Sequence, residues 1–268
     1  MSKFLVIGNP IEHSLSPPIH NYWFKKYNFV NHSYEKKKVN EEDLEKIVDA
    51  LRKNELKGIN VTVPFKQKII PYLDGLDYKA KKTQSVNTLL KKDNKVFGYN
   101  TDSVGFCATL SKKYNHETAG NYKFFVIGAG GVTSSIIDGI GKANKIYVTN
   151  RTTGRAEELK KKFPQIEIIN WGTKPPICDV IINTTSVGLT KDENLKIDFT
   201  NYLNNKHALF YDLIYNPKET NFLKNAKLRG NKIMNGQMMF LYQAQASFQL
   251  WTDVNPEIND EIIKILDL

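Results

Sequence analysis

The 268-residue sequence has little cysteine and no long apolar run, and both absences narrow the kind of protein it can encode. Its two cysteines, Cys107 and Cys178, have neither Cys-x-x-Cys spacing nor a nearby histidine cluster, which argues against a disulfide framework or a zinc site. No uninterrupted apolar segment reaches the length that a transmembrane helix needs. We therefore expect a reduced, cytoplasmic protein without a metal centre and without a membrane partner.

Acidic residues are also fewer than basic ones, since 28 Asp and Glu face 38 Lys and Arg, for a formal net charge of +10. Such an excess can indicate a nucleic-acid partner or an anionic ligand. The lysines are scattered in short groups, however, and no helix-turn-helix, RRM or KH pattern accompanies them. We interpret the charge as a solvated surface that helps to collect anionic small molecules and a phosphorylated cofactor, and we expect no nucleic-acid partner.

The chain can bury a sizeable core, because 41% of its residues are hydrophobic and its length exceeds one typical domain. Over the first hundred residues the strand and helix patterns alternate. The predicted strands are 4–7, 33–37, 58–63, 85–90 and 95–99, and the predicted helices are 17–27, 44–51 and 102–110. Asn40 has the position of a helix N-cap, and Asp93-Asn94 lies between two strands as in a hairpin turn.

A second series of strands begins at residue 123. These strands are predicted at 123–127, 145–149, 167–170, 179–183 and 208–213, and the chain turns helical again beyond Gly236. Strands separated by helices indicate a mostly parallel sheet with covered faces. The sequence therefore predicts an α/β fold.

A glycine-rich turn follows the first strand of this second series. The run Gly128–Gly131 comes directly after an apolar strand and before a helix that contains Ile136 and Ile137. Glycines let the backbone approach a pyrophosphate, and the helix N-terminus supplies free N–H groups and a positive dipole end. The run departs from Gly-x-Gly-x-x-Gly and is a weak signal alone, but its strand–loop–helix context predicts a dinucleotide-binding domain.

The next strand ends about 20 residues after the glycines, where dinucleotide-binding folds contact the adenosine ribose. An Asp or Glu there would bind the 2′-hydroxyl of NAD, but this chain has Asn150, Arg151, Thr152 and then Arg155. Two guanidinium groups suit a 2′-phosphate. The pattern favours NADP(H); the alternative is a pair of ordinary surface arginines at a strand-to-helix turn.

In the N-terminal half, one predicted strand stops at a proline and is followed by a lysine. Asn60 and Thr62 are two residues apart and share one face, whereas Val63 is expected to point toward a core. Because Pro64 ends the strand, Lys66 should lie at its carboxyl end, where open α/β sheets bind their ligands. The alternative is a surface lysine after an ordinary turn.

Two further places carry unusual polar side chains. Ser16 stands before a proline, as an N-cap does, and Ser14 precedes it. Two hydroxyl groups and a helix N-terminus make a natural carboxylate site, although Ser16 could simply cap the helix. Asp102 could likewise be only a capping carboxylate, or it could hold the Lys66 ammonium in place, with Asn87 at the same edge of the sheet.

Together these motifs resemble those of the shikimate dehydrogenases, in order and over nearly the whole chain. The Asn-Val-Thr-Val-Pro-Phe-Lys segment at 60–66 and the Asn-Thr-Asp segment at 100–102 are specific, whereas the glycine loop is shared with many folds. The other segments that carry the resemblance are 8–17, 85–88, 128–131, 150–152, 211–217, 235–239 and 243–244.

The resemblance implies a fold of two domains. Residues 1–103 with 236–268 would form a mostly parallel α/β substrate-binding domain, and residues 104–235 a Rossmann-like NADP-binding domain. Lys66 and Asp102 would form a catalytic dyad. The implied substrate contacts are Ser14, Ser16, Thr62, Asn87, Tyr215 and Gln243. The implied NADP(H) contacts are Gly128, Ala129, Gly130, Gly131, Val132, Thr133, Asn150, Arg151, Thr152, Arg155, Leu213 and Gly236.

Three places depart from the usual pattern of the family. Val132-Thr133-Ser134-Ser135 follows the glycine loop, where the family usually has Ala and then Ala or Ser. Thr184 stands where Ala is usual in Ile-Asn-Ala-Thr-Ser, and Asn221 stands where Pro is common. None of these positions belongs to the implied dyad, so we expect them to affect cofactor affinity rather than the reaction.

The implied activity is the NADPH-dependent, reversible reduction of 3-dehydroshikimate to shikimate in chorismate and aromatic amino-acid biosynthesis. A quinate/shikimate dehydrogenase with relaxed cofactor use is one alternative; it would typically carry an acidic residue near Thr152 and Thr153. A non-catalytic ligand sensor on the same fold is another; it would be expected to lose Lys66 or Asp102, and both are present. We expect a small-molecule substrate and a monomer or homodimer.

Overall fold

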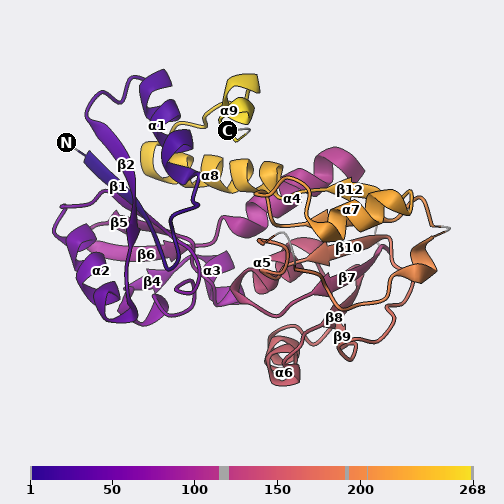
Figure 1. The fold of residues 1–268 in the computed structure, drawn as a ribbon. Coiled ribbons are helices and arrows are strands. Elements are labelled where there is room, and N and C mark those ends of the chain that lie inside the picture. Colours follow the sequence, from indigo (N-terminus) through magenta and orange to yellow (C-terminus); the bar gives the residue numbers. More distant parts are fainter. Residues whose placement is uncertain (1, 115–120, 191–192, 204, 267–268) are drawn as a thin grey trace. The chain divides into compact units, whose positions relative to one another are not determined.

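The structure, a computed structural model, describes residues 2–114, 121–190, 193–203 and 205–266 (Figure 1). The chain divides into two compact units. Unit 1 comprises residues 1–106 and 241–268, and unit 2 comprises residues 107–240. The boundaries fall inside the helices α4 (Asp102–Tyr114) and α8 (Gln237–Thr252). Among the described residues, no helix combines the length and the apolar character that crossing a membrane requires.

Unit 1 is built on a six-stranded sheet with the order β2-β1-β3-β5-β6-β4. β1 is parallel to both β2 and β3, and β4 is parallel to β6, whereas β5 is antiparallel to β3 and β6. The strands are β1 (Ser2–Gly8), β2 (His32–Lys38), β3 (Gly58–Val61), β4 (Gly75–Leu76), β5 (Thr88–Lys92) and β6 (Lys95–Tyr99). Asp93 and Asn94, both with positive φ, form the predicted hairpin turn between β5 and β6.

The helices of unit 1 cover both faces of this sheet. They are α1 (Ser16–Lys26), α2 (Leu44–Arg52), α3 (Tyr78–Thr83), α9 (Asp260–Ile265) and the two 3₁₀ turns η1 (Glu41–Asp43) and η2 (Ile70–Tyr72). Asn40 caps η1 in a capping box with Asp43, and the chain continues directly into α2, which confirms the predicted helix start.

Alternate side chains of β1 point to opposite faces of the sheet, and each face packs against a different core. Leu5 and Ile7 pack with the apolar stripe of α2 on one face. Phe4 points the other way, where its ring lies 5.0 Å from that of Phe24 in α1 and 5.2 Å from that of Trp251 in α8. The sheet is therefore buried on both sides, as the predicted α/β fold requires.

Unit 2 contains a second six-stranded sheet, with the order β12-β11-β10-β7-β8-β9 and only parallel pairs. Its strands are β7 (Lys123–Ile127), β8 (Lys145–Thr149), β9 (Ile166–Ile168), β10 (Val180–Asn183), β11 (Leu209–Asp212) and β12 (Lys232–Met234). Its other elements are α5 (Gly131–Ile140), α6 (Thr153–Lys162), α7 (Asn221–Leu228) and the 3₁₀ turn η3 (Thr200–Tyr202). Counted from β7, this is the order 3-2-1-4-5-6 of dinucleotide-binding sheets.

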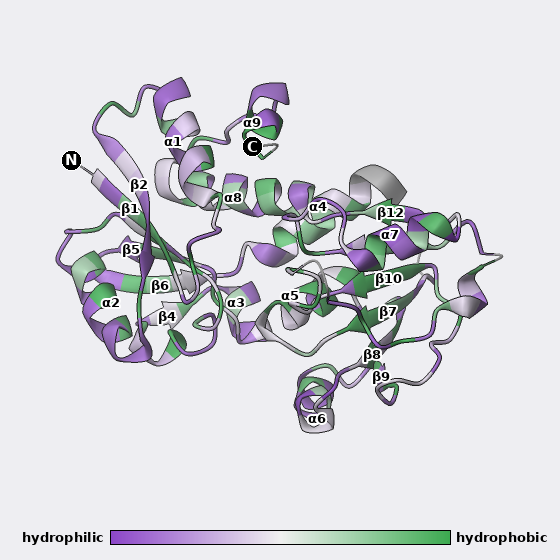
Figure 2. Ribbon diagram, in the orientation of Figure 1, coloured by the Kyte–Doolittle hydropathy of each residue, from purple (hydrophilic) through white to green (hydrophobic). Residues whose placement is uncertain are grey.

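The central strands of unit 2 are apolar along their length, as Figure 2 shows for β7 and β10. All four residues of β10 and four of the five in β7 are buried. The strand order reverses between these two strands, and open α/β sheets bind their ligands at the carboxyl ends of the strands at such a point. In unit 2 that point lies beside the glycine loop after β7.

The structure differs from the predicted fold in three details. Val63 is 64% exposed rather than pointing to a core, because β3 ends at Val61 and the chain turns; Phe65, which is buried, takes that place in the core. The short strands β4 and β12 were not predicted, because two and three residues give no readable alternation. The predicted strand 85–90 begins only at Thr88.

Candidate functional site

Lys66 is positioned by the turn that follows β3. The backbone N–H of Phe65 donates to the carbonyl of Thr62 at 2.9 Å, and the carbonyl of Lys66 accepts from the N–H of Val86 at 2.8 Å. These bonds direct the lysine side chain inward, where only 14% of it is exposed. Its Nζ donates to Asp102 Oδ2 at 2.7 Å and has no other hydrogen-bond partner among the described residues. Two of its three N–H bonds therefore remain available to a ligand.

Asp102 occupies the first turn of α4, where the helix dipole stabilises a carboxylate. Its side chain is 6% exposed, its backbone N–H donates to Asn100 Oδ1, and its Oδ1 accepts from Asn87 Nδ2 at 3.0 Å. The carboxylate thus holds both an ammonium and an amide. The structure brings Lys66, Asp102 and Asn87 together at the carboxyl edge of this sheet, where the sequence had left open whether Asp102 holds the lysine or only caps the helix.

The α8 helix supplies the next partners. Gln243 Oε1 lies 3.3 Å from Asn87 Nδ2, which links the helix to the Lys66–Asp102 pair. One turn further along, Ser247 Oγ lies 2.8 Å from Thr88 Oγ1 and 3.1 Å from Asn60 Nδ2. Residues four apart share one helix face, so Gln243 and Ser247 approach the sheet together.

A buried hydrogen-bond network extends behind these residues, and the sequence did not reveal it. Tyr34 Oη donates to Asn60 Oδ1 at 2.6 Å, and Asn60 Nδ2 donates to the carbonyl of Asn87 at 3.0 Å. Thr101 adds a further bond, because its N–H donates to Asn87 Oδ1 at 2.8 Å. Tyr34 lies on β2, too far along the chain for any local pattern to pair it with Asn60. The i, i+4 spacing from Gln243 could have indicated Ser247.

The N-terminal serines differ in detail from the prediction. Ser16 is the first residue of α1 rather than its N-cap, and no side chain caps this helix directly. Instead Ser14 Oγ accepts from the N–H of Ser16 at 3.4 Å, because the loop places the earlier serine over the helix start. Ser16 is buried, whereas Ser14 is half-buried. Thr62, also half-buried, follows β3 directly.

Tyr215, Leu213 and Gly236 belong to unit 2. The Tyr215 ring stacks on Phe240 with 4.5 Å between the ring centroids. Leu213 follows β11, and the backbone N–H of Gly236 donates to the carbonyl of Ile214. A Cβ on Gly236 would lie 2.0 Å from the carbonyl oxygen of Leu213, so only glycine fits this close approach.

The glycine loop occupies the point where the strand order of unit 2 reverses. Gly128 has φ +115°, a conformation that favours glycine, and Gly130 is the N-cap of α5. No atom lies within 4 Å of a Cβ built on Gly130, so there is open space beside the helix start. The N–H groups of Gly131 and Val132 belong to the first turn, which has no intrahelical acceptors. This cradle suits a pyrophosphate.

The end of β8 holds the loop and presents two cations. Asn150 Oδ1 accepts from the N–H of Ala129 at 3.1 Å, and Asn150 Nδ2 donates to the carbonyl of Thr152 at 2.8 Å. The structure therefore gives Asn150 a role in shaping the loop. Arg151 and Arg155 are exposed and form no ion pair with the described residues, so both guanidinium groups are available to a phosphate.

A buried carboxyl group lies at the end of β11. Asp212 is completely buried and accepts from Asn183 Nδ2 at 3.1 Å, from the N–H of Ile214 at 3.0 Å and from Thr220 Oγ1 at 2.7 Å. Burial raises the pKa of Asp212 to about 6, although these three hydrogen bonds oppose the shift. Thr220 also caps α7, so this carboxyl group ties β10, β11 and α7 together.

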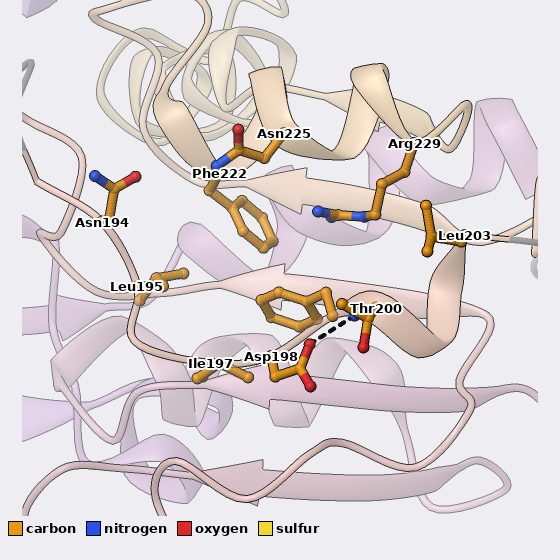
Figure 3. Close-up of a pocket in the computed structure, with 10 residues that line it drawn as sticks. Asn194, Leu195, Ile197, Asp198, Thr200, Leu203, Phe222, Asn225 and Arg229 are labelled. Carbon is orange, nitrogen blue, oxygen red and sulfur yellow. Dashed lines mark hydrogen bonds between the residues drawn. The ribbon is translucent and has the colours of Figure 1, made fainter.

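A separate cavity of about 360 Å³ in unit 2 contains none of the predicted site residues (Figure 3). Arg229, whose guanidinium carbon lies 5.7 Å from the ring centroid of Phe199, lines it, and Phe222 of α7 forms part of its wall. Asp198 accepts from the N–H of Thr200 at 2.8 Å along the same wall. The ring contact and a bond from Arg229 Nε to Asn231 account for the position of the arginine without a ligand.

The strand order of unit 2 and its glycine cradle are those of a nucleotide-binding α/β protein, and unit 1 contains a largely buried pair of a lysine and a carboxylate, Lys66 and Asp102. The sequence model of the shikimate dehydrogenase substrate binding domain matches residues 6–89. A shikimate dehydrogenase (NADP(+)) of Pelagibacter ubique is 50% identical over 267 residues, which cover 99% of this chain and 98% of the relative. The chain belongs to the shikimate dehydrogenase family.

Solved structures agree with this assignment. A shikimate dehydrogenase crystallised with NADP⁺ superposes with a TM-score of 0.89 at 32% identity and covers 100% of this chain and 95% of its own. A shikimate 5-dehydrogenase of Listeria monocytogenes, in complex with shikimate and NAD, gives a TM-score of 0.86 at 27% identity, with coverage of 99% and 96%. The predicted two-domain α/β fold is confirmed.

Proposed function

We propose that this protein catalyses the reversible, NADPH-dependent reduction of 3-dehydroshikimate to shikimate in the pathway to chorismate and the aromatic amino acids. The observation that carries the proposal is the Lys66 ammonium, which is largely buried and has Asp102 as its one partner among the described residues. Membership of a family of NADP(+)-dependent shikimate dehydrogenases supports the same reaction.

The proton chemistry follows from this pair. NADPH supplies a hydride to the ketone carbon, and the oxygen that becomes an alkoxide needs a proton at once. In our proposal Lys66 donates that proton from Nζ, and in the oxidation direction its neutral amine takes the proton back. Asp102 holds Nζ at 2.7 Å and fixes the direction of the remaining N–H bonds. Lys66 is therefore the proposed general acid and base, and Asp102 is the group that orients it.

We assign the substrate to unit 1. Its carboxylate would be bound by the hydroxyl groups of Ser14 and Ser16 near the start of α1, where the helix dipole favours an anion. Its ring hydroxyl groups would be bound by Thr62, Asn87, Gln243 and Tyr215, the residues that the family resemblance implies; of these, Asn87 contacts both Asp102 and Gln243. The hydrogen bonds that already fix Asn87 reduce the ordering that substrate binding requires.

We assign NADP(H) to unit 2. The pyrophosphate would lie on the glycine cradle at residues 128–133, and Arg151, Thr152 and Arg155 would bind the 2′-phosphate. Leu213 and Gly236 would line the nicotinamide end. The absence of an acidic residue after β8 supports NADP(H) over NAD, because a carboxylate there would repel the 2′-phosphate. In this assignment the substrate-binding domain is residues 1–103 with 236–268 and the NADP-binding domain is residues 104–235, close to the observed units.

The first experiment compares initial rates of shikimate oxidation with NADP⁺ and with NAD⁺, uses quinate as a second substrate, and includes Lys66→Ala. We expect strong turnover that depends on NADP⁺ and shikimate and is lost in the variant. Comparable rates with quinate or with NAD⁺ would instead favour a quinate/shikimate dehydrogenase. Folded protein that binds shikimate but turns over no pair would favour the ligand sensor. We also propose a cytoplasmic protein that is a monomer or a homodimer, which sedimentation can test.

A further inference from the structure

Two buried threonines from different elements meet beneath the glycine loop. Thr133 Oγ1, on the first turn of α5, lies 2.8 Å from Thr184 Oγ1, which follows β10 directly. Thr133 is fully buried and Thr184 is 8% exposed. Their contact joins the loop to the neighbouring strand at the point where the strand order reverses.

The donors and acceptors around this contact form one continuous chain. The N–H of Gly130 donates to Thr133 Oγ1 at 3.1 Å, and Thr184 Oγ1 donates to the carbonyl of Ile127 at 2.8 Å. A carbonyl can only accept, so Thr184 must use its single hydroxyl proton on Ile127. Thr133 then donates to Thr184, and every hydroxyl group has one donor and one acceptor role. The chain begins and ends on the backbone that flanks Gly128.

The loop is therefore held from both sides. On the β8 side, Asn150 Oδ1 accepts from the N–H of Ala129 at 3.1 Å. On the β10 side, the threonine pair reaches both ends of the loop, and Thr184 Oγ1 would lie 2.5 Å from a Cβ on Gly128. Neither the Asn150 bond nor the threonine pair uses the N–H groups of Gly131 and Val132, which remain directed out of the first turn of α5.

We propose that Thr133 and Thr184 are positioning residues that hold the glycine loop in its cofactor-binding conformation and so set the affinity for NADP(H). The inference rests on the proposed function, because it assigns the cofactor to this loop. A loop ordered before binding loses less conformational freedom when the pyrophosphate arrives, and the affinity rises by that difference.

The test uses substitutions that separate the hydroxyl group from the volume of the side chain. Thr184→Val and Thr133→Val keep the shape and remove the hydroxyl, whereas Thr184→Ser and Thr133→Ser keep the hydroxyl. Thr149→Val is the matched control, because Thr149 is buried at the end of β8 beside the loop and its Oγ1 has no hydrogen-bond partner among the described residues. The dissociation constant of NADPH is measured by fluorescence titration without substrate, followed by steady-state kinetics with shikimate and by thermal unfolding.

We expect Thr184→Val to weaken NADPH binding about fivefold, the size of one lost hydrogen bond. The KM for NADP⁺ should rise in parallel, while kcat at saturation and the KM for shikimate change less than about twofold, as loss of uniform binding predicts. Thr184→Ser and Thr149→Val should bind as the wild type does. The Thr133→Val/Thr184→Val double variant should resemble either single variant, because the two hydroxyl groups act as one unit.

Three results would overturn the inference: unchanged NADPH binding in Thr184→Val, equal losses in the Val and Ser variants, or additive losses in the double variant. Equal losses in the Val and Ser variants would mean that the loss of affinity does not follow the hydroxyl group, so that hydrogen bonding by these side chains does not position the loop. If wild-type protein fails to bind NADPH at all, the assignment of the cofactor to unit 2 fails first, and with it the proposed function.

Discussion

Lys66 Nζ lies 2.7 Å from Asp102 Oδ2 although 36 residues separate the two along the chain. Each residue is placed by the end of a regular element, the lysine by the turn after β3 and the aspartate by the first turn of α4. The pair therefore depends on the geometry of the sheet rather than on a flexible loop. The helix dipole stabilises the carboxylate, and the carboxylate in turn holds the ammonium.

Lys66→Ala should lower kcat for shikimate oxidation by about 10²- to 10⁴-fold, the usual contribution of a general acid or base. The KM for shikimate should change little, because the proton is needed only as the alkoxide forms or is consumed. Lys68→Ala is the matched control, since Lys68 lies two residues away and pairs with Glu41 on the surface. A variant at Lys66 with near-normal turnover would remove the lysine from the mechanism.

Arg151→Ala should raise the KM for NADP⁺ by about 10- to 100-fold, the range of a lost hydrogen bond between charged groups. The KM for NAD⁺ should stay nearly constant, because NAD⁺ has no 2′-phosphate. Lys161→Ala, an exposed cation on α6, controls for the general loss of positive charge. Equal changes for both cofactors would show that Arg151 does not distinguish them.

Tyr34→Phe should lower the free energy of unfolding of unit 1 by about 1–3 kcal/mol, because it leaves the buried Asn60 Oδ1 without its donor. Trp23 and Trp251 lie in unit 1 and Trp171 lies in unit 2, so tryptophan fluorescence follows unit 1 alone when the urea titrations are made in a Trp171→Phe background. Tyr78→Phe removes the hydroxyl of a side chain that is 78% exposed and should leave the midpoint unchanged. The idea that this network supports the site fails if both variants unfold at the wild-type midpoint.

Asp212 should make the stability of unit 2 depend on pH. Its pKa is raised from 3.8 to about 6, so between these values the folded state keeps a proton that the unfolded state has released. Stability from this group therefore falls as pH rises from about 4 to 6, by up to about 3 kcal/mol, and stays level above pH 7. Below pH 3.8 the carboxyl is protonated in both states and the effect vanishes.

Asp212→Asn tests this dependence, because the amide keeps the shape of the group and cannot ionise. The difference in unfolding free energy between the variant and the wild type should move in favour of the variant from pH 4 to 6. Asp198→Asn is the contrasting control, because the backbone N–H of Thr200 lowers the pKa of Asp198. The Asp198→Asn variant should therefore lose stability relative to the wild type as pH rises. This change should occur at a more acidic pH than the change for Asp212→Asn. A flat difference for Asp212→Asn would mean that its pKa is not raised.

The sequence predicted the regular elements well where a local pattern determines them. The strands at 123–127 and 145–149 were predicted with their observed bounds, and Asp93-Asn94 determined the hairpin. Patterns are read along the chain, so contacts across it were missed. The bond between Tyr34 and Asn60, and the contact between Thr133 and Thr184 across 51 residues, exist only once the strands are in register.

The same limit explains the errors around the candidate site. Lys66 and Asp102 could be predicted because each follows a readable strand, and Asn87 could be predicted because it lies within the predicted strand 85–90. Ser16 was predicted as the N-cap of α1 but is the first residue of the helix. The sequence could not distinguish these positions, because both Ser14 and Ser16 are suitable residues for a helix start. Val63 was expected to be buried because the strand pattern continues through it, whereas the strand ends two residues earlier.

Unit 1 is discontinuous, because residues 107–240 are inserted into it. On the ribosome, all of unit 2 emerges before the segment that completes unit 1. Until then Phe4 lacks the ring of Trp251, the carbonyl of Leu89 lacks the indole N–H, and Asn87 lacks Gln243. A nascent or truncated chain that stops near residue 240 would thus have a complete unit 2, whereas unit 1 would still expose an apolar sheet face, the kind of surface that chaperones and proteases recognise. Completion of unit 1 therefore requires residues 241–268 as well as residues 1–106.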